Sequence, residues 1–317
     1  MTEGTTAGKG TLWDKFIDES IQLLNEKGLL CFITPSGWRK PEHKLYKKMT
    51  SDNQLLYLHI YGQKKTKELF HVSARVDLYV IEIGPRHKNT AIIDENGDKH
   101  NIDLKDWNDF LPNYYFTEIQ HILTSKEKGI KVIYNTAYHS NPKECKTKFN
   151  KEGKYIYPVV HAINQKGLEF IYANDNDKEK GHFGIPKVIL NKNGTQYTYP
   201  EQNDHSGKYG MSEVSFGIPI KNETEGDLVL KALETPKFKE IILATRWMTA
   251  QIDYRMFKYF KPDFYKYFLR EGAGKKNKQF ITKKHQERKN KTKKSSPKSG
   301  GTRKRNRTRQ TKKYYFW

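Results

Sequence analysis

A strongly apolar run lies unusually close to the start of this chain. Residues Leu29–Thr34, "LLCFIT", are apolar on consecutive positions, a pattern typical of a strand buried on both faces of a helix-covered parallel sheet. Residues Thr11–Gly28 predict an amphipathic helix, because apolar side chains recur at steps of three and four and a glycine follows. A helix that leads by a short turn into such a strand is half of a βαβ unit, which favours an α/β fold.

The following segments continue this pattern as far as Gly84-Pro85. A helix is expected over residues 41–50, where Pro41 suits a first turn. Strands are expected in "NQLLYLHIYG" and "ARVDLYVIEIG", and the "QKKTKELF" between them predicts a basic loop that ends on an aromatic residue. Asp77 and Glu82 in the last strand are expected to pair with basic neighbours on the surface.

The pattern of apolar and polar residues changes after residue 85. Helical patterns occur over 113–125 and 227–250, and short runs of Tyr, Ile and Val lie between them. Lys192-Asn193-Gly194 separates two such runs and predicts a hairpin turn. These features indicate an α+β domain.

The excess of positive charge is concentrated in the last part of the chain. The net charge is +22, and residues 275–313 hold 18 of the 58 Lys and Arg residues with one acid, which accounts for +17. A segment so charged and so poor in apolar residues is expected to be disordered in isolation. We therefore expect three parts, which are residues 1–85, residues 86–270 and a disordered basic tail over 271–317.

Several classes of protein are excluded by composition. The 317 residues include only Cys31 and Cys145, too few for a disulfide framework or a cysteine-rich zinc site, which suggests a reducing, intracellular location. His43, His59 and His71 lack the spacing of metal ligands, so no metal is expected. No run approaches the roughly 18 apolar residues of a membrane span, so no membrane partner is expected.

Three segments, taken in order, resemble a known enzyme family. They are "LWDKFIDESIQLLNEKGLLCFITPSGW", the basic segment that leads into "LFHVSARVDLYVIEIG", and the long domain after it. This order is similar to the C-terminal half of a gamma-type adenine-N6 DNA methyltransferase of restriction-modification systems, of the type IIG-like kind with a target-recognition domain. The likeness is good over residues 8–85, and looser through "YPVVHAIN", "FGIPKVIL", "SGKYGMS" and "YFKPDFYKYF".

The resemblance implies a partial, Rossmann-like methyltransferase sheet, followed by an α+β target-recognition domain. It also implies transfer of a methyl group from S-adenosylmethionine to adenine N6 in DNA, with the adenine extruded from the duplex. Phe70 matches the family's base-stacking aromatic, although a core phenylalanine is the plain alternative. The strand that ends in "ITPSGW" should end near the pocket, so the candidates for its lining are Thr34, Pro35, Ser36 and Trp38. For Trp38, packing beneath the next helix is favoured over a pocket role.

Two groups of basic residues are candidates for DNA contacts. Lys64, Lys65 and Lys67 stand beside Phe70 and suit phosphate contacts, although an ordinary solvated surface explains them equally well. The tail residues Arg303, Lys304, Arg305, Arg307 and Arg309 suit sequence-independent phosphate binding or nuclear localisation. Nuclear rather than cytoplasmic location follows only if the tail is a localisation signal. Candidates for reading bases are Lys187, Asn191, Lys192, Asn193 and Lys208, although each is more often a plain surface residue.

The sequence departs from the family where the chemistry should be. It contains no Pro-Pro, so the (Asn/Asp)-Pro-Pro-(Tyr/Phe) segment that holds the amino group is missing, and no FxGxG-type turn for the cofactor is present. Met1 would then fall just after the catalytic motif, and no catalytic residue is expected in this chain. Three interpretations remain open: half of a split enzyme completed by a separate polypeptide, a truncated gene product, or a non-catalytic DNA-binding or specificity module. Methylation of RNA is a further alternative.

Overall fold

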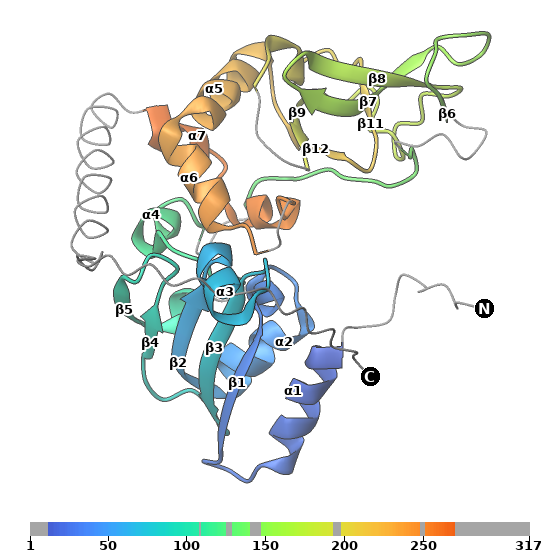
Figure 1. The fold of residues 1–317 in the computed structure, drawn as a ribbon. Coiled ribbons are helices and arrows are strands. Elements are labelled where there is room, and N and C mark those ends of the chain that lie inside the picture. The colour runs from blue at the N-terminus through green and yellow to red at the C-terminus, as the bar shows by residue number, and fades with distance from the viewer. Residues whose placement is uncertain are drawn as a thin grey trace, which may run out of the picture. The chain divides into compact units, whose positions relative to one another are not determined.

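The computed structural model describes residues 12–107, 109–124, 129–139, 147–192, 198–247 and 251–269. The expected disordered tail, Thr11 at the start of the expected first helix, and the expected turn at Asn193-Gly194 lie outside these ranges. Figure 1 shows the arrangement of the helices and strands.

The first two elements occur in the expected order. Helix α1 spans Leu12–Leu23 and strand β1 spans Leu29–Pro35. The helix ends earlier than the sequence pattern predicts, and Lys27 takes a left-handed backbone conformation with φ of 64° in the turn before β1. The next position, residue 28, requires glycine. A Cβ there would lie 2.8 Å from the carbonyl oxygen of Asn25, so no larger residue fits without a shift.

Strand β1 lies at one edge of a mixed five-stranded sheet. The order is β1-β3-β2-β4-β5, where β2 spans Gln54–Tyr61, β3 Val76–Glu82, β4 Thr90–Ile93 and β5 Lys99–Ile102. Strand β3 is antiparallel to both β1 and β2, so those two strands run in the same direction. Strand β4 is parallel to β2, and β5 is antiparallel to β4. The sheet therefore takes two strands from beyond residue 85, where the sequence suggested that the unit closes.

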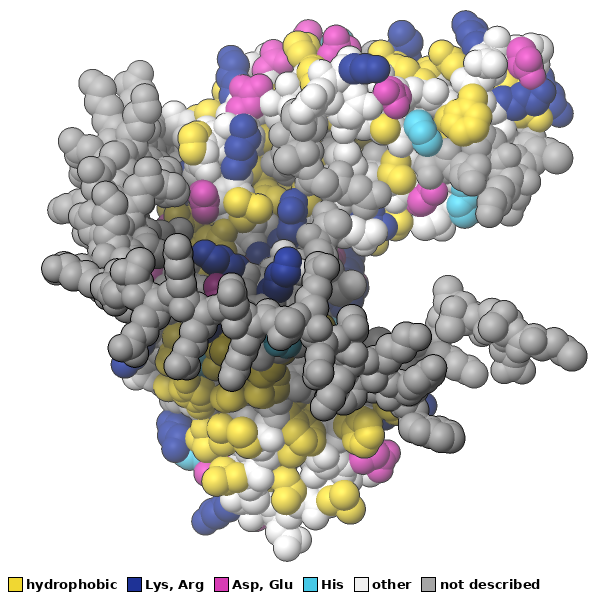
Figure 2. Space-filling model, in the orientation of Figure 1, with side chains coloured by type: hydrophobic (Ala, Val, Ile, Leu, Met, Phe, Trp, Pro, Cys, Tyr) yellow, Lys and Arg dark blue, Asp and Glu magenta, His cyan; other side chains and the backbone are white. Residues whose placement is uncertain are grey.

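The two faces of this sheet differ in burial. On one face, Asp77, Tyr79 and Ile81 of β3 are fully buried and pack toward a core that includes Ile17 of α1 and Trp38. On the opposite face, the side chains of β1 are exposed, and hydrophobic side chains gather over this part of the molecule in Figure 2. The expectation that β1 is buried on both faces was wrong, because β1 pairs only with the antiparallel β3 in the described residues and carries helices on one side.

Short helical segments connect β1 to β2 and β2 to β3. A 3-10 turn over Ser36–Arg39 leads to α2, Lys44–Lys47, which continues as a π-helical turn over Lys48–Asp52. Helix α3 spans Gln63–Phe70, where a basic loop was expected. It ends because His71 adopts a left-handed conformation with φ of 58°.

The described residues beyond β5 form two further sheets and four helices. One sheet has the order β10-β9-β12 and the other β11-β7-β8-β6. The strands are β6 Thr147–Lys148, β7 Tyr157–Asn164, β8 Gly167–Ala173, β9 Lys187–Asn191, β10 Asn203–Asp204, β11 Gly210–Met211 and β12 Ser215–Pro219. The helices are α4 Phe116–Gln120, α5 Glu223–Glu234, α6 Pro236–Ala244 and α7 Phe264–Leu269, with 3-10 turns at Leu104–Asp106, Pro200–Gln202 and Tyr254–Tyr259.

The long helix expected over 227–250 is divided in two. Thr235 has an extended backbone with ψ of 140°, which ends α5, and its side chain caps α6 by accepting from the Phe238 N–H. Pro236 then occupies the first turn of α6, where its missing N–H costs nothing. The molecule is thus a mixed α/β protein, as the sequence predicted. No described helix reaches the length and apolar character needed to cross a bilayer.

Candidate functional site

The four residues expected to line a pocket lie at the carboxyl end of β1 and differ in burial. Thr34 and Ser36 are buried and Pro35 is exposed. The Ser36 hydroxyl donates to Oδ1 of Asp77 at 2.9 Å, and the Thr34 hydroxyl lies 3.5 Å from the Tyr79 hydroxyl. Trp38 is fully buried in the hydrophobic core.

The ring of Trp38 packs against two tyrosines. Its centroid lies 5.8 Å from that of Tyr79, edge to face, and 6.4 Å from that of Tyr46. Its indole Nε1 finds no hydrogen-bond partner among the described residues. Burial raises the pKa of the Tyr79 phenol well above its usual value, so this group stays neutral beneath the site.

A buried ion pair, which the sequence did not reveal, lies directly below these residues. Arg39 and Asp77 are both fully buried, and Nε of Arg39 is 2.7 Å from Oδ2 of Asp77. Asp77 had been expected to pair on the surface. That expectation was wrong, because the face of β3 that carries Asp77 and Tyr79 is the covered one.

The guanidinium of Arg39 has all five of its N–H donors engaged. Besides two bonds to Asp77, it donates to the carbonyl oxygens of Leu111 at 3.0 Å and Pro112 at 2.9 Å, and to Oδ1 of Asn113 at 2.8 Å. Asn113 in turn donates through its backbone N–H to Ala244 at the end of α6. Arg39 therefore ties the end of β1 to the segment before α4 and, through it, to α6.

Helix α3 carries the other candidates near this edge. Lys64, Lys65 and Lys67 are all exposed, and Lys65 lies 3.5 Å from Glu68. Phe70, at the last position of α3, is 43% exposed, and its ring meets that of Tyr61 edge to face at 6.4 Å. A side chain this open is free to contact a ligand, whereas a core phenylalanine would not be.

The structure places both groups at the same edge of the sheet. Strands β1 and β2 run in the same direction, so the carboxyl end of β1 lies at the edge where β2 leads through Gly62 into α3. The backbone N–H of Ser36 donates to the Arg75 carbonyl at 3.2 Å, and the Thr66 hydroxyl donates to the Ala74 carbonyl at 2.5 Å. The segment after Phe70 thus joins α3 to the end of β1, and this edge is the candidate site.

Aromatic rings extend from this edge along β2. The rings of His59 and Tyr61 are stacked with centroids 4.1 Å apart, and Tyr57 meets His59 edge to face at 6.4 Å. Burial lowers the pKa of His59, which favours its neutral form between these rings.

The base-reading candidates are placed very differently from one another. Lys187 is fully buried, and its Nζ lies 2.8 Å from Oδ2 of Asp204, so it cannot reach a DNA base in this structure. Lys208 is exposed, and Asn191 donates to the Ile163 carbonyl at 2.9 Å. Lys192 donates to the Tyr134 hydroxyl at 2.7 Å. Asn193 and the five tail residues Arg303, Lys304, Arg305, Arg307 and Arg309 lie outside the described residues.

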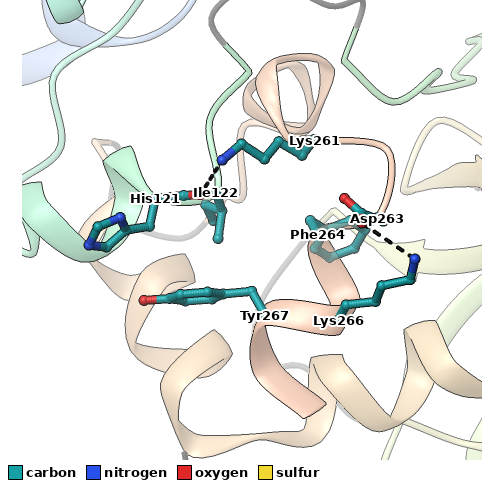
Figure 3. A pocket seen from close by; sticks show the side chains of 7 residues that line it. All are labelled: His121, Ile122, Lys261, Asp263, Phe264, Lys266 and Tyr267. Carbon is teal, nitrogen blue, oxygen red and sulfur yellow. Dashed lines mark hydrogen bonds and ion pairs between the residues drawn. The ribbon is translucent and has the colours of Figure 1, made fainter. Parts of the chain in front are cut away.

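Three cavities lie away from the candidate edge. The first, of about 450 Å³, is lined by His121, Ile122, Lys261, Asp263, Phe264, Lys266 and Tyr267 (Figure 3). Its lysines are already engaged, since Lys261 donates to the His121 carbonyl at 2.8 Å and Lys266 lies 3.5 Å from Asp263. The other two, of about 340 and 240 Å³, lie beside Lys192 and beside Asp109, and burial raises the pKa of Asp109.

Neither the three cavities nor the described side chains identify where S-adenosylmethionine or a metal would bind. None of the three cavities is lined by the residues at the end of β1 or by Phe70. The full sequence has no glycine-rich turn of the family's kind. In the part of the chain that the structure describes, no cluster of His, Cys, Asp and Glu could hold a metal ion.

The fold and the candidate edge define an α/β protein whose first sheet has one open face and, among the described residues, an unpaired edge at β1. Residues 2–70 match the sequence model of the family described as Eco57I restriction-modification methylase. Over these residues the chain is similar to a restriction-modification methylase, which confirms the resemblance seen in the sequence. No curated protein matches the chain.

A solved structure of the Type IIL restriction-modification enzyme MmeI in complex with DNA is similar to this chain. The TM-score is 0.41 at 10% sequence identity, over 78% of this chain. The present chain spans 39% of the MmeI chain.

Proposed function

We propose that this chain is the DNA-facing portion of a restriction-modification methylase that transfers a methyl group from S-adenosylmethionine to N6 of adenine in DNA. The observation that carries the proposal is the position of Phe70. It is the last residue of the matched family segment, and it stands half-exposed at the edge where β1 and β2 end. Ligand sites of α/β sheets lie at carboxyl ends of strands.

In this proposal the chain supplies base capture and DNA contacts. Phe70 stacks on the extruded adenine, and the exposed Lys64 and Lys67 contact phosphates beside it. Lys208 and the basic tail add further contacts to DNA, whereas the buried Lys187 serves the fold. The missing cofactor turn and Pro-Pro segment come from a separate N-terminal methyltransferase half.

The test is methyl transfer by the chain mixed with the polypeptide encoded directly upstream. Labelled S-adenosylmethionine and duplex DNA are supplied, and the DNA is digested to nucleosides to identify the methylated base. Phe70→Ala should lower kcat/KM roughly 5- to 150-fold, because stacking of a base on an aromatic ring contributes about 1–3 kcal/mol. Phe70→Tyr keeps the ring and should retain activity.

Ile156→Ala is the control, since Ile156 is 45% exposed and lies between β6 and β7, beside a different sheet from the one that carries the candidate edge. DNA binding without methyl transfer would favour the alternative of a non-catalytic specificity module. Transfer to RNA in preference to DNA would favour an RNA methyltransferase.

A further inference from the structure

The uncovered face of the first sheet is apolar over three neighbouring strands. Leu29 is 60% exposed and Ile33 is 49% exposed, and both point away from the core with Cys31 between them. Their neighbours on the same face, by strand register, are partly exposed side chains of β3 and β2: Leu78, Val80, Tyr57, His59 and Tyr61.

Helix α1 carries further exposed apolar side chains. Its core-facing stripe packs beneath the sheet, but Leu12, Phe16 and Leu23 form a second stripe that is 68%, 60% and 83% exposed. These three positions fall within about 40° of one another around the helix axis. Of the eleven large apolar side chains that are exposed among the described residues, eight lie within residues 12–72. The bare apolar surface therefore belongs mostly to residues 12–72, which overlap the segment that matches the methylase family, and not to the whole molecule.

The edge of β1 is also free. One side of this strand pairs with β3 over all seven residues, and the other side pairs with no strand among the described residues. An exposed, apolar edge strand is a template for pairing with another chain, and proteins normally shield such edges. Within β1 the edge carries no lysine, arginine or acid that would discourage pairing.

We propose that a second polypeptide docks here, adding a strand to the free edge of β1 and packing helices against the open face. This proposal rests on the proposed function, since the partner is the half that carries the glycine-rich turn and the Pro-Pro-aromatic segment. A second copy of this chain is a poorer occupant, because it lacks both segments as well.

The chemistry of the face favours protein over nucleic acid. Along β1, β3 and β2, Glu82 is the one charged residue on the outward side, and it lies 3.6 Å from His87. A surface that binds nucleic acid needs Lys and Arg to replace the counterions of the phosphates, whereas apolar contact suits a packed helical layer.

The direction of the added strand follows from the position of the candidate site. Ligand loops of α/β sheets leave the carboxyl ends of strands. If the added strand is parallel to β1, its carboxyl end lies next to Pro35 and at the edge that carries Phe70. The loops of the partner would then complete the pocket that this chain only borders.

The experiment measures assembly separately from catalysis. The chain and the polypeptide encoded directly upstream are purified and mixed, and binding is measured by sedimentation and by calorimetry without DNA. Ile33→Lys should weaken binding roughly 100-fold or more, because an unpaired charge would be buried in the interface. Ile156→Lys is the matched control, since Ile156 is 45% exposed and lies outside residues 12–72. This variant should bind the upstream polypeptide as tightly as the parent chain does.

Cys31 gives a readout that does not depend on a destabilising substitution. It is an exposed free thiol on the proposed interface, and in a Cys145→Ser background it is the only thiol in the chain. Its rate of reaction with a maleimide should fall at least tenfold in the mixture, and should be unchanged when the upstream polypeptide is replaced by serum albumin.

Several outcomes would overturn the docking surface: no complex with the upstream polypeptide, self-association of this chain through the same face, or equal binding by Ile33→Lys and Ile156→Lys. An upstream reading frame that lacks both segments would overturn it too. A complex that forms with Cys31 protected but transfers no methyl group would refute the proposed function and leave the docking surface standing. Methyl transfer that is unaffected by Ile33→Lys would refute the docking surface and leave the proposed function standing.

Discussion

Arg39 and Asp77 form an ion pair that is completely shielded from water, with Nε and Oδ2 2.7 Å apart. The two residues come from the turn after β1 and from β3, so the pair fastens the end of the edge strand to the strand beside it. Through its bonds to Leu111, Pro112 and Asn113, Arg39 also holds the segment that leads into the second half of the chain. The buried ion pair therefore supports the candidate site from beneath, and neither of its side chains reaches the surface.

Removing one partner of this pair should destabilise the fold strongly. Asp77→Ala leaves the Arg39 charge buried without a counterion, which is expected to cost about 3–5 kcal/mol of unfolding free energy. Urea unfolding followed by tryptophan fluorescence measures the change. Glu68→Ala removes the exposed pair with Lys65 and should cost less than about 1 kcal/mol. Equal effects of the two substitutions would show that the buried pair contributes little.

Substitutions of Lys187 and Lys208 should have different effects, the first on stability and the second on DNA binding. Lys187→Met strips Asp204 of its buried counterion and is expected to cost about 3 kcal/mol in urea unfolding. Lys208→Met should leave stability unchanged and weaken binding to duplex DNA, because Lys208 is exposed. Fluorescence anisotropy with labelled DNA measures the second effect. A loss of base specificity in a folded Lys187→Met protein would contradict the structural role of Lys187.

Stability should fall as the solution becomes acidic below neutral pH. Burial lowers the pKa of His43, His59 and His182 relative to the ordinary value near 6.5. The unfolded chain then binds more protons than the folded one, so the stabilisation is complete above about pH 6.5 and is lost as pH falls toward the folded pKa values. Urea midpoints at pH 7.5 and 5.5 measure the loss.

His59→Phe tests the contribution of one of these groups. The substitution keeps a ring stacked on Tyr61 and removes the titration, so the difference between the two urea midpoints should become smaller. A difference as large as that of the parent chain would exclude His59 as a source of the pH dependence.

The basic tail should govern how DNA affinity depends on salt. Each phosphate contact contributes about 0.9 to the slope of log affinity against log salt for duplex DNA, so replacing five basic residues by Gln should lower its magnitude by at most about 4.5. The residues are Arg303, Lys304, Arg305, Arg307 and Arg309. Titrations between 50 and 300 mM salt, roughly the range over which such binding collapses, measure the slope. An unchanged slope would mean that the tail does not contact phosphates.

The sequence predicted the early elements well, because their signals are local. The stripe of Ile17 and its neighbours defines α1, and the apolar run after it defines β1. The family resemblance also depended only on the order of short segments. Boundaries were less accurate: Thr235-Pro236 interrupts what was expected to be one helix, since a backbone break of one residue barely alters the apolar period.

The burial of each sheet face could not be predicted from the sequence. Val76, Leu78 and Val80 alternate along β3 as a core-facing set should, yet Leu78 and Val80 are partly exposed, while Asp77 and Tyr79 on the other side are fully buried. Both sides of the strand are suited to burial, so periodicity could not choose between them. The choice depended on which side the helices cover.

The sequence by itself determined the α/β character of this protein, the order of its first helix and strand, the concentration of charge in its tail and its kinship with a methylase. Those properties follow from residue spacing and composition along the chain. Only the tertiary structure decided that Arg39 meets Asp77, that Lys187 is buried, and that one sheet face remains bare. These are long-range relationships, and they depend on which segments pack together when the chain collapses around its apolar core.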